Sequence, residues 1–255
     1  MNNEIFVINL DKSTSRLETS TQQLKAAGLS FTRIPAVYGA DLSKTEKNTH
    51  YSSDLNHKLF YRKLNDGEIG AYLSHRKAWQ AIVDKELDYG IVFEDDFILR
   101  DDLNKAIENI NAIPFEWDYI KLASYNSKEI KQKVIYQKRL IDMDLVAYTK
   151  VVTGASATVI SYKAAKELLV KTERFGRPFD TDLQYWWEKN IHIFCLLPFV
   201  SAQDENMLSD IDSTGGKRNK SNNRFFQRQF IQIKKFFLNR HHNAAFLAKY
   251  NNLDL

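Results

Sequence analysis

Residues 89–96 read Tyr-Gly-Ile-Val-Phe-Glu-Asp-Asp, an apolar run that ends abruptly in three carboxylates. A continuous apolar run of this length, rich in β-branched and aromatic residues, is typical of a buried strand. In open α/β sheets, ligands bind at the carboxyl ends of the strands, which is where Glu94, Asp95 and Asp96 stand. The stretch therefore predicts a buried strand with a binding site at its exit.

The segments on both sides of this stretch alternate between strand-like and helical patterns. Strands are expected at 5–10, 31–34, 117–122, 146–160 (interrupted at Gly154) and 191–197, and helices at 13–27, 65–85, 161–172 and 179–189. Asn65 and Glu68 form a capping-box pattern at the start of the longest helix. The polar segment 41–65 is expected to be a long, partly irregular excursion, and 201–223 a mobile loop. This alternation predicts an α/β fold, with a mostly parallel sheet covered by helices on both faces.

The net charge of +4 is unevenly distributed over the 255 residues. Nine of the 36 Lys and Arg residues, but only one of the 32 acidic residues, lie from Lys217 onward, so this tail carries +8 and the rest −4. We expect a catalytic domain over 1–216 and a basic amphipathic tail over 217–255. No apolar run reaches the roughly 18 residues of a membrane span and no secretory signal is evident, so we expect a cytoplasmic body.

The three acids at 94–96 suggest a metal site. In an extended backbone, Glu94 and Asp96 face one side and Asp95 the other. Mg²⁺ and Mn²⁺ suit such oxygen ligands and typically take one or two carboxylates together with water and substrate phosphates. A solvated turn or a helix cap is the alternative interpretation. Taken alone, the motif also fits a phosphatase or a nucleotidyltransferase, because it specifies metal and phosphate better than it specifies a reaction.

Other enzyme classes have less support. The sequence contains no Gly-x-x-x-x-Gly-Lys-Ser/Thr loop, and no Gly-x-Gly-x-x-Gly comes after the first expected strand. The single cysteine, Cys195, lies in an apolar run where we expect a core residue, so a thiol nucleophile has little support.

Six short segments occur in a fixed order along the chain. They are Val7–Asp11 with Arg16, Arg33–Gly39, Gly67–His75 with Ala78 and Trp79, Ile91–Asp96, Thr153–Ala155, and Pro178–Asp180. In this order they resemble glycosyltransferase family 25, the lipooligosaccharide and lipopolysaccharide core transferases that also include collagen galactosyltransferases. The resemblance extends over roughly residues 4–212. It implies the GT-A architecture, a nucleotide-binding α/β domain with a mixed sheet, and an Asp-x-Asp-type metal motif that here reads Glu-Asp-Asp.

The resemblance implies an inverting transfer of a hexose to a hydroxyl of a lipid-linked oligosaccharide, the lipooligosaccharide or lipopolysaccharide. UDP-galactose is the preferred donor and UDP-glucose the second choice. Glu94 and Asp96 are expected to hold Mn²⁺ or Mg²⁺ against the departing diphosphate. Inversion needs a carboxylate base, for which Asp180 and then Asp182 are the candidates. Capping the adjoining helix is the alternative role of Asp180.

Further residues are expected to contact the donor. They are Asn9, Leu10, Arg16, Ala36, Tyr38, Gly39, Glu68, Ser74, His75, Asp95, Thr153 and Gly154. Structural alternatives remain: Asn9 can end a strand, His75 can be a satisfied histidine, and Thr153 with Gly154 can form a bulge. Gln203 and Asp204 rank lowest as pocket residues.

The tail carries an apolar stripe at helical spacing, Phe226, Phe230, Ile233 and Phe237. We expect it to bind an anionic membrane, on the inner face of the bacterial inner membrane. Packing on the catalytic domain or on a second subunit is the alternative, so an oligomer remains possible, and no nucleic acid is expected. Two other functions stay open: a metal-dependent phosphohydrolase and a non-catalytic nucleotide-sugar-binding membrane adaptor.

Overall fold

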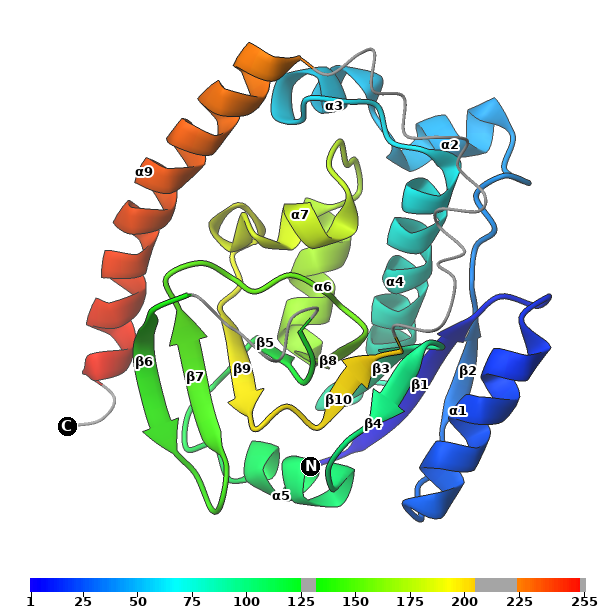
Figure 1. Ribbon diagram of the computed structural model, residues 1–255, viewed down its shortest axis with the longest axis vertical. Coiled ribbons are helices and arrows are strands. Elements are labelled where there is room, and N and C mark those ends of the chain that lie inside the picture. Colours follow the sequence, from blue (N-terminus) through cyan, green and yellow to red (C-terminus); the bar gives the residue numbers. More distant parts are fainter. Residues whose placement is uncertain (125–131, 205–223, 253–255) are drawn as a thin grey trace.

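The computed structural model describes residues 1–124, 132–204 and 224–252 and shows a strand layer covered by helices (Figure 1). The described residues form an eight-stranded sheet of order β2-β1-β3-β8-β5-β9-β7-β6 and a two-stranded sheet, β10-β4. The strands are β1 Asn3–Asn9, β2 Thr32–Pro35, β3 Tyr89–Glu94, β4 Phe97–Leu99, β5 Tyr119–Lys121, β6 Val134–Arg139, β7 Asp144–Tyr148, β8 Ala157–Ser161, β9 Ile193–Leu197 and β10 Ser201–Gln203. The helices are α1 Thr14–Ala26, α2 Lys44–His50, α3 Ser53–Leu59, α4 Asp66–Asp84, α5 Leu103–Asn111, α6 Tyr162–Lys171, α7 Phe179–Leu183, the 3₁₀ helix η1 Trp186–Lys189 and α9 Phe225–Asn251.

The large sheet is mixed. β1 pairs in parallel with β2 and β3, and β5 pairs in parallel with β9, whereas the other pairings in this sheet are antiparallel. Within the described chain, six of its eight strands run in one direction, and β7 and β8 run against them. The predicted mixed, mostly parallel sheet is therefore confirmed. Ile8 lies opposite Glu94 in the β1–β3 register, so the acidic turn emerges beside the end of β1.

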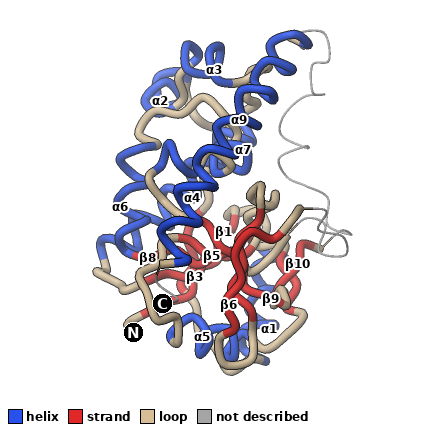
Figure 2. Tube along the Cα trace, turned by 90° about the vertical axis from the view of Figure 1, so that its left-hand side faces the viewer, coloured by secondary structure: helices blue, strands red, loops and turns tan. Residues whose placement is uncertain are grey.

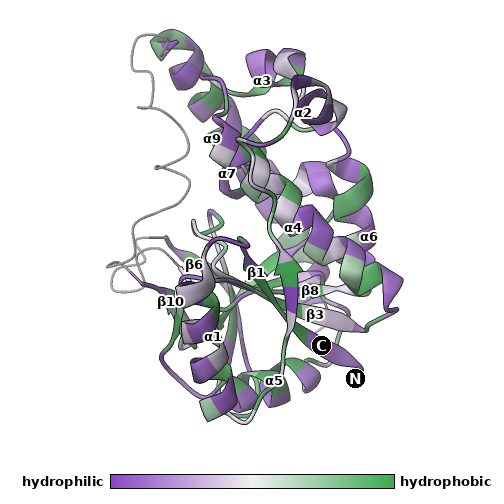
Figure 3. Ribbon diagram, turned by 90° about the vertical axis from the view of Figure 1, so that its right-hand side faces the viewer, coloured by the Kyte–Doolittle hydropathy of each residue, from purple (hydrophilic) through white to green (hydrophobic). Residues whose placement is uncertain are grey.

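The strands form the core because their apolar side chains are covered on both faces. Every residue of β3 before Glu94 is buried, as the continuous apolar run predicted. Figure 3 shows α4 and α6 on one side of the strands and α1 with α5 on the other, and both α1 and α4 contact β1. Helices therefore cover both faces of the strands.

The structure corrects several expected boundaries. The excursion at 41–65 contains two short helices, α2 and α3, which begin at the side-chain caps Ser43 and Ser52. The helix expected over 179–189 is divided into α7 and η1. The interruption expected at Gly154 within 146–160 is confirmed, because β7 and β8 lie on either side of it and Gly154 has a φ of +92°. Of the loop expected at 201–223, the first three residues form β10 and most of the rest lies outside the described residues.

The C-terminal helix α9 lies along the body, from α3 at one end to β6 at the other (Figures 1 and 2). Gln227 Nε2 donates to the carbonyl oxygen of His57 in α3 at 2.5 Å. At the other end, Phe246 and Tyr250 are buried in the same core as the strands. None of the helices in the described parts of the chain is long and apolar enough to cross a membrane.

Candidate active site

The three acids at the end of β3 contact different elements of the fold. The Asp95 carboxylate turns toward β1 and α1, where it accepts a hydrogen bond from Asn9 Nδ2 at 2.6 Å and pairs with Arg16 at 3.3 Å. Glu94 Oε1 lies 2.9 Å from Nε2 of His75 in α4. Asp95 therefore holds the turn against β1 and α1, whereas Glu94 and Asp96 are its two other carboxyl groups.

Glu94 and Asp96 lie where a negative charge is poorly stabilised by the protein. Burial raises the pKa of Glu94 to about 8, and the charges of Asp180 and Asp95 add to the shift. Burial and the charge of Glu94 raise the pKa of Asp96 to about 7. Carboxylates in this condition gain stability from a bound cation.

Asp96 offers an oxygen for such a cation. Its Oδ2 accepts a hydrogen bond from Gln203 Nε2 at 2.7 Å, but Oδ1 is buried and has no hydrogen-bond partner among the described residues. Within those residues, no group of three or more acids, histidines or cysteines is arranged to hold a metal. A divalent ion that binds through one or two carboxylates and a diphosphate needs no such group, so Asp96 and Glu94 fit an Mg²⁺ or Mn²⁺ ion brought with a nucleotide.

His75, in α4, positions Glu94. Its ring is buried and stacks on Phe179, with centroids 3.9 Å apart. Burial lowers the pKa of His75 to about 4, so the ring is neutral at pH 7, and its Nε2 shares a hydrogen bond with Oε1 of Glu94. His75 is therefore a contact of the acidic cluster.

Lys121 is a site residue that the sequence analysis missed. Its side chain is 1% exposed in β5, and Nζ donates to the carbonyl oxygen of Gly154. Burial lowers the pKa of Lys121, and the charges of Asp180 and Glu94 oppose that shift. A lysine inside the apolar run 117–122 was the available signal, because a fully buried lysine normally needs an acidic partner.

The two candidate bases have different surroundings. Asp180 is half-buried in the first turn of α7, and its charge acts on His75, Glu94 and Lys121, which places it at the acidic cluster. The N-cap of α7 is Pro178, so the alternative that Asp180 caps this helix is wrong. Asp180 is therefore the candidate base nearest to the acids of β3.

Asp182 is held by positive charge. It pairs with Arg177 at 2.9 Å and Lys189 at 3.0 Å, and it accepts a hydrogen bond from the Tyr72 hydroxyl at 2.7 Å. Although burial raises the pKa of Asp182, Lys189 and Arg177 hold it below its ordinary value. These bonds join α4, α7 and η1 and favour a scaffold role for Asp182.

The turn at 35–39 is packed directly on α4. Ser74 Oγ accepts from the backbone N–H of Val37 at 2.8 Å and donates to the carbonyl oxygen of Gly70 at 2.7 Å. A Cβ at Gly39 would lie 1.8 Å from the carbonyl oxygen of Asp66, so only glycine permits this approach. Ser74 and Gly39 thus hold the turn in place.

The end of β1 is fixed by a side chain that the sequence analysis did not select. Arg33 Nε donates to Asn9 Oδ1 at 3.0 Å, and the backbone N–H of Ala36 donates to the carbonyl oxygen of Asn9 at 2.9 Å. The carbonyl oxygen of Leu10 accepts from the N–H of Ser13 at 2.9 Å. Asn9 therefore links β1, β2 and the acidic turn.

Three other predicted residues lie in different settings. Glu68 completes the predicted capping box with Asn65 and binds both terminal nitrogens of Arg62, at 2.7 and 2.6 Å. Tyr38 lies beneath the Lys12 ammonium, 3.9 Å from ring centroid to Nζ. Thr153 is exposed beside Gly154.

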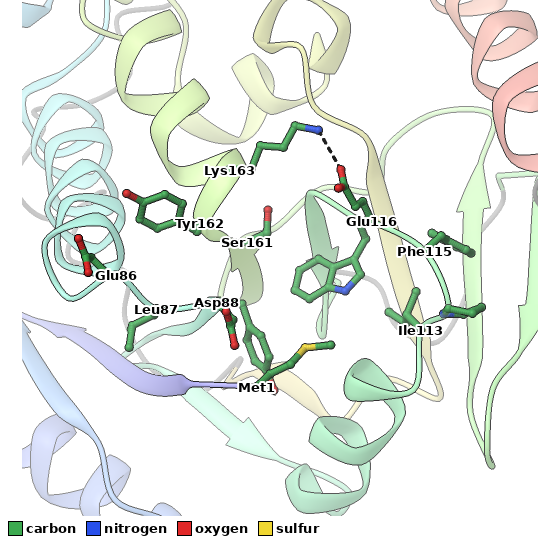
Figure 4. Close-up of a pocket in the computed structure, with 13 residues that line it drawn as sticks. Met1, Glu86, Leu87, Asp88, Ile113, Phe115, Glu116, Ser161, Tyr162 and Lys163 are labelled. Atoms are coloured by element: carbon green, nitrogen blue, oxygen red, sulfur yellow. Dashed lines mark hydrogen bonds and ion pairs between the residues drawn. The ribbon is translucent and has the colours of Figure 1, made fainter.

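A hollow of about 730 Å³ lies at the opposite end of β3 from the acids and is lined by Met1, Asp88, Tyr89, Trp117 and Lys163 among others (Figure 4). Asp88 there accepts from the backbone N–H of Asn2 at 2.7 Å, and Lys163 pairs with Glu116 at 3.5 Å. These charged groups have partners, unlike Asp96 Oδ1.

Comparison with known proteins gives a consistent family. The model of glycosyltransferase family 25 (LPS biosynthesis protein) matches residues 2–183. Human procollagen galactosyltransferase 2 is 28% identical over 198 residues, covering 73% of this chain and 30% of its own, so the chain spans about a third of such relatives. A Haemophilus influenzae protein named as a candidate glycosyltransferase is 27% identical, covering 78% of this chain and 70% of its own.

Two further similarities establish less: the first concerns activity and the second concerns the fold. The mouse inactive glycosyltransferase 25 family member 3 is 26% identical, covering 83% of this chain and 39% of its own, so likeness to the family does not by itself establish activity. Among solved structures, a Drosophila β-1,4-galactosyltransferase 7 mutant in complex with manganese, UDP-Gal and xylobiose has a TM-score of 0.39 and 8% identity, covering 86% of this chain and 82% of its own. A score of this size does not establish a shared fold.

Proposed function

The chain belongs to glycosyltransferase family 25, and from this premise we propose that it is an active, metal-dependent, inverting glycosyltransferase. The observation that carries the proposal is the buried, unpartnered Oδ1 of Asp96, which lies beside Glu94 at the end of β3. A third carboxylate, Asp180, acts electrostatically on Glu94 and is the proposed base that an inverting reaction requires.

Each residue of the cluster has a separate role in the proposed reaction. Asp96 and Glu94 would hold the divalent ion, which when bound would neutralise charge on the departing diphosphate. His75 positions Glu94 through the hydrogen bond between Nε2 and Oε1, and Lys121 places a basic group within electrostatic range of Glu94 and Asp180. Asp180 accepts the proton of the acceptor hydroxyl as that oxygen attacks C1 of the sugar.

We propose UDP-galactose as donor, with UDP-glucose second, and a lipooligosaccharide or lipopolysaccharide core as acceptor. The support is the family description and the galactosyltransferase names among the relatives. Asn9, the turn at 35–39 and Arg16 surround the acidic turn and are the proposed nucleotide side of the pocket.

A donor panel tests this function. The protein is incubated with Mn²⁺, truncated lipooligosaccharide and one UDP-hexose at a time, and the mass of the acceptor is measured by mass spectrometry. We expect a product heavier by one hexose with UDP-galactose. Release of free phosphate without transfer would support a phosphohydrolase instead, and nucleotide binding without any turnover would support an adaptor.

We also propose that the outer face of α9 docks on the anionic inner face of the bacterial inner membrane. Its stripe is exposed, with Phe226 at 86% and Phe230, Ile233 and Phe237 above half, so it does not pack on the body. Substituting Phe226 and Phe230 together with serine should weaken co-sedimentation with phosphatidylglycerol vesicles. Unchanged sedimentation would remove the membrane role and leave a second subunit as the partner of this stripe.

A further inference from the structure

A groove of about 680 Å³ runs between α9 and the segments that flank β6 and β7. Its described lining contains three cations, Lys150, Lys235 and Arg240, and no acidic residue. The groove lies on a different part of α9 from the exposed stripe of Phe226, Phe230, Ile233 and Phe237, none of which lines it.

Lys235 is the unusual member of this set. Its side chain is 6% exposed, Nζ donates to Oε1 of Gln184, and Nζ lies 4.9 Å from the ring centroid of Tyr185. No carboxylate of the described residues pairs with it. Burial and the positive charges of Lys150 and Arg177 lower the pKa of Lys235 to about 7. A buried ammonium among cations gains stability from an anion.

The other lining groups suit a saccharide. Asn239 and Asn243 both donate through Nδ2 to the carbonyl oxygen of Thr149, and their amide oxygens are acceptors for hydroxyl groups. Phe236 lines the groove with 64% of its surface exposed and offers an apolar face for a sugar ring. A few polar groups around an apolar surface are typical of small-molecule sites.

Two short segments connect the groove to the candidate active site. The segment 149–156 begins at Thr149 in the groove, passes Gly154, which accepts from Lys121, and reaches Ser156, whose carbonyl oxygen accepts from the N–H of Glu94 at 2.9 Å. Gln184, the partner of Lys235, comes directly after α7, the helix that carries Asp180. The groove is therefore linked to Glu94 along the chain, and to the helix that carries Asp180 through the hydrogen bond between Lys235 and Gln184.

We propose that the groove binds a phosphate or carboxylate group carried by a saccharide, and that this saccharide is the anionic part of the acceptor. The second half of the statement rests on the proposed transferase function. Lys150 and Arg240 supply the exposed charges, Lys235 supplies the buried charge, and the amides and Phe236 contact the sugar ring.

Isothermal titration of the full chain, without donor or metal, tests the site directly. Glucose 6-phosphate is the probe, with glucose and inorganic phosphate as references. We expect glucose 6-phosphate to bind more tightly than either reference. Lys150→Gln and Arg240→Gln should each weaken it by about tenfold, the size of a charge-assisted hydrogen bond. Lys234→Gln, the same charge change at an exposed neighbouring position outside the groove, should leave binding unchanged.

Absence of glucose 6-phosphate binding, or equal weakening by Lys234→Gln, would overturn the site. Inorganic phosphate that binds as tightly as the sugar phosphate would overturn the saccharide. A lipid headgroup is the other possible ligand. If phosphatidylglycerol vesicles displaced the probe from the unmodified protein and did not bind Arg240→Gln, the groove would be a lipid site and the proposal would be overturned. The titration involves no turnover, so its result is independent of the transfer assay. If the protein transfers sugar but does not bind the probe, the groove is not a binding site. If it binds the probe but does not transfer sugar, the groove binds a saccharide that is not an acceptor.

Discussion

The acidic turn after β3 contains carboxyl groups, whereas the groove along α9 contains basic groups. In both regions, buried ionisable groups lack a partner of opposite charge among the described residues. In the turn, burial raises the pKa values of Glu94 and Asp96 to about 8 and about 7. In the groove, burial and two neighbouring cations lower the pKa of Lys235 to about 7. Both regions are in an electrostatic condition that a ligand of opposite charge would relieve.

A third buried cluster shows the ordinary arrangement. Asp182 lies between Arg177 and Lys189, and the Tyr72 hydroxyl donates a further bond. Asp182 is buried like Asp96, yet its pKa is lowered, because the cations outweigh the cost of burial. The contrast suggests that paired buried charges hold this fold together, and that unpaired ones mark where it binds something.

Asp96→Ala is expected to have the largest effect. It removes the unpartnered oxygen at the proposed metal position, so we expect kcat for transfer to fall by about 10³-fold. The fold should remain, because the substitution removes a buried carboxylate that lacks a compensating cation. Steady-state kinetics with UDP-galactose and Mn²⁺, beside thermal unfolding, measure both effects.

Asp84→Ala is the matched control, since Asp84 is an acid at the far end of α4 from the site. It should retain the activity of the unmodified protein. If Asp96→Ala were also fully active, Asp96 would have no part in catalysis. The unpaired buried groups of the turn would then not indicate a binding site, and the comparison with the groove would fail.

The second prediction separates the two aspartates of α7. Asp180→Asn should lower kcat by about 100-fold with little change in stability, because it removes a general base. Asp182→Asn should lower the free energy of unfolding by about 3 kcal/mol, because it removes the buried acid of the pair and leaves Arg177 and Lys189 with only the more exposed Glu188. Urea unfolding and kinetics on both variants measure the difference. The reverse pattern, with Asp182→Asn stable and inactive, would make Asp182 the base.

Local sequence pattern was sufficient for features made by neighbouring residues. The apolar run 89–93 predicted β3, and the three acids after it predicted the charged turn. Asn65 and Glu68 predicted the start of α4, which the structure confirms with both capping-box hydrogen bonds. In each case the interactions that form the feature lie within a few residues.

Features made by distant residues were not predictable in the same way. Lys121 lies within electrostatic range of Glu94 and Asp180 because of the position of β5 between β8 and β9, and this strand order is not encoded in any local pattern. The periodicity over 179–189 indicated one helix, whereas the chain tightens into a 3₁₀ turn where Lys189 pairs with Asp182.

Helix α9 shows the same limit on a larger scale. Its amphipathic pattern correctly predicted a helix, but periodicity cannot tell which face the protein covers. In the structure the aromatic stripe with Phe226 and Phe230 is exposed, and the buried residues are Lys235, Phe246 and Tyr250. A lysine on the covered face was not expected from hydrophobicity, and it is the residue that defines the cationic groove.

The smallest predicted effect concerns this lysine and pH. The unfolded chain holds the Lys235 proton up to about pH 10.5, whereas the folded chain releases it above about pH 7. Between these values unfolding takes up a proton, so this residue makes stability rise with pH. Relative to Lys235→Met, the unmodified protein should gain about 2 kcal/mol in free energy of unfolding from pH 7 to pH 9. Urea unfolding at both pH values measures the gain. Lys234→Met, at the exposed neighbouring position, should show the same pH dependence as the unmodified protein. If Lys235→Met also behaved like the unmodified protein, the ammonium would be satisfied in the fold, and the groove would no longer be the cationic counterpart of the acidic turn.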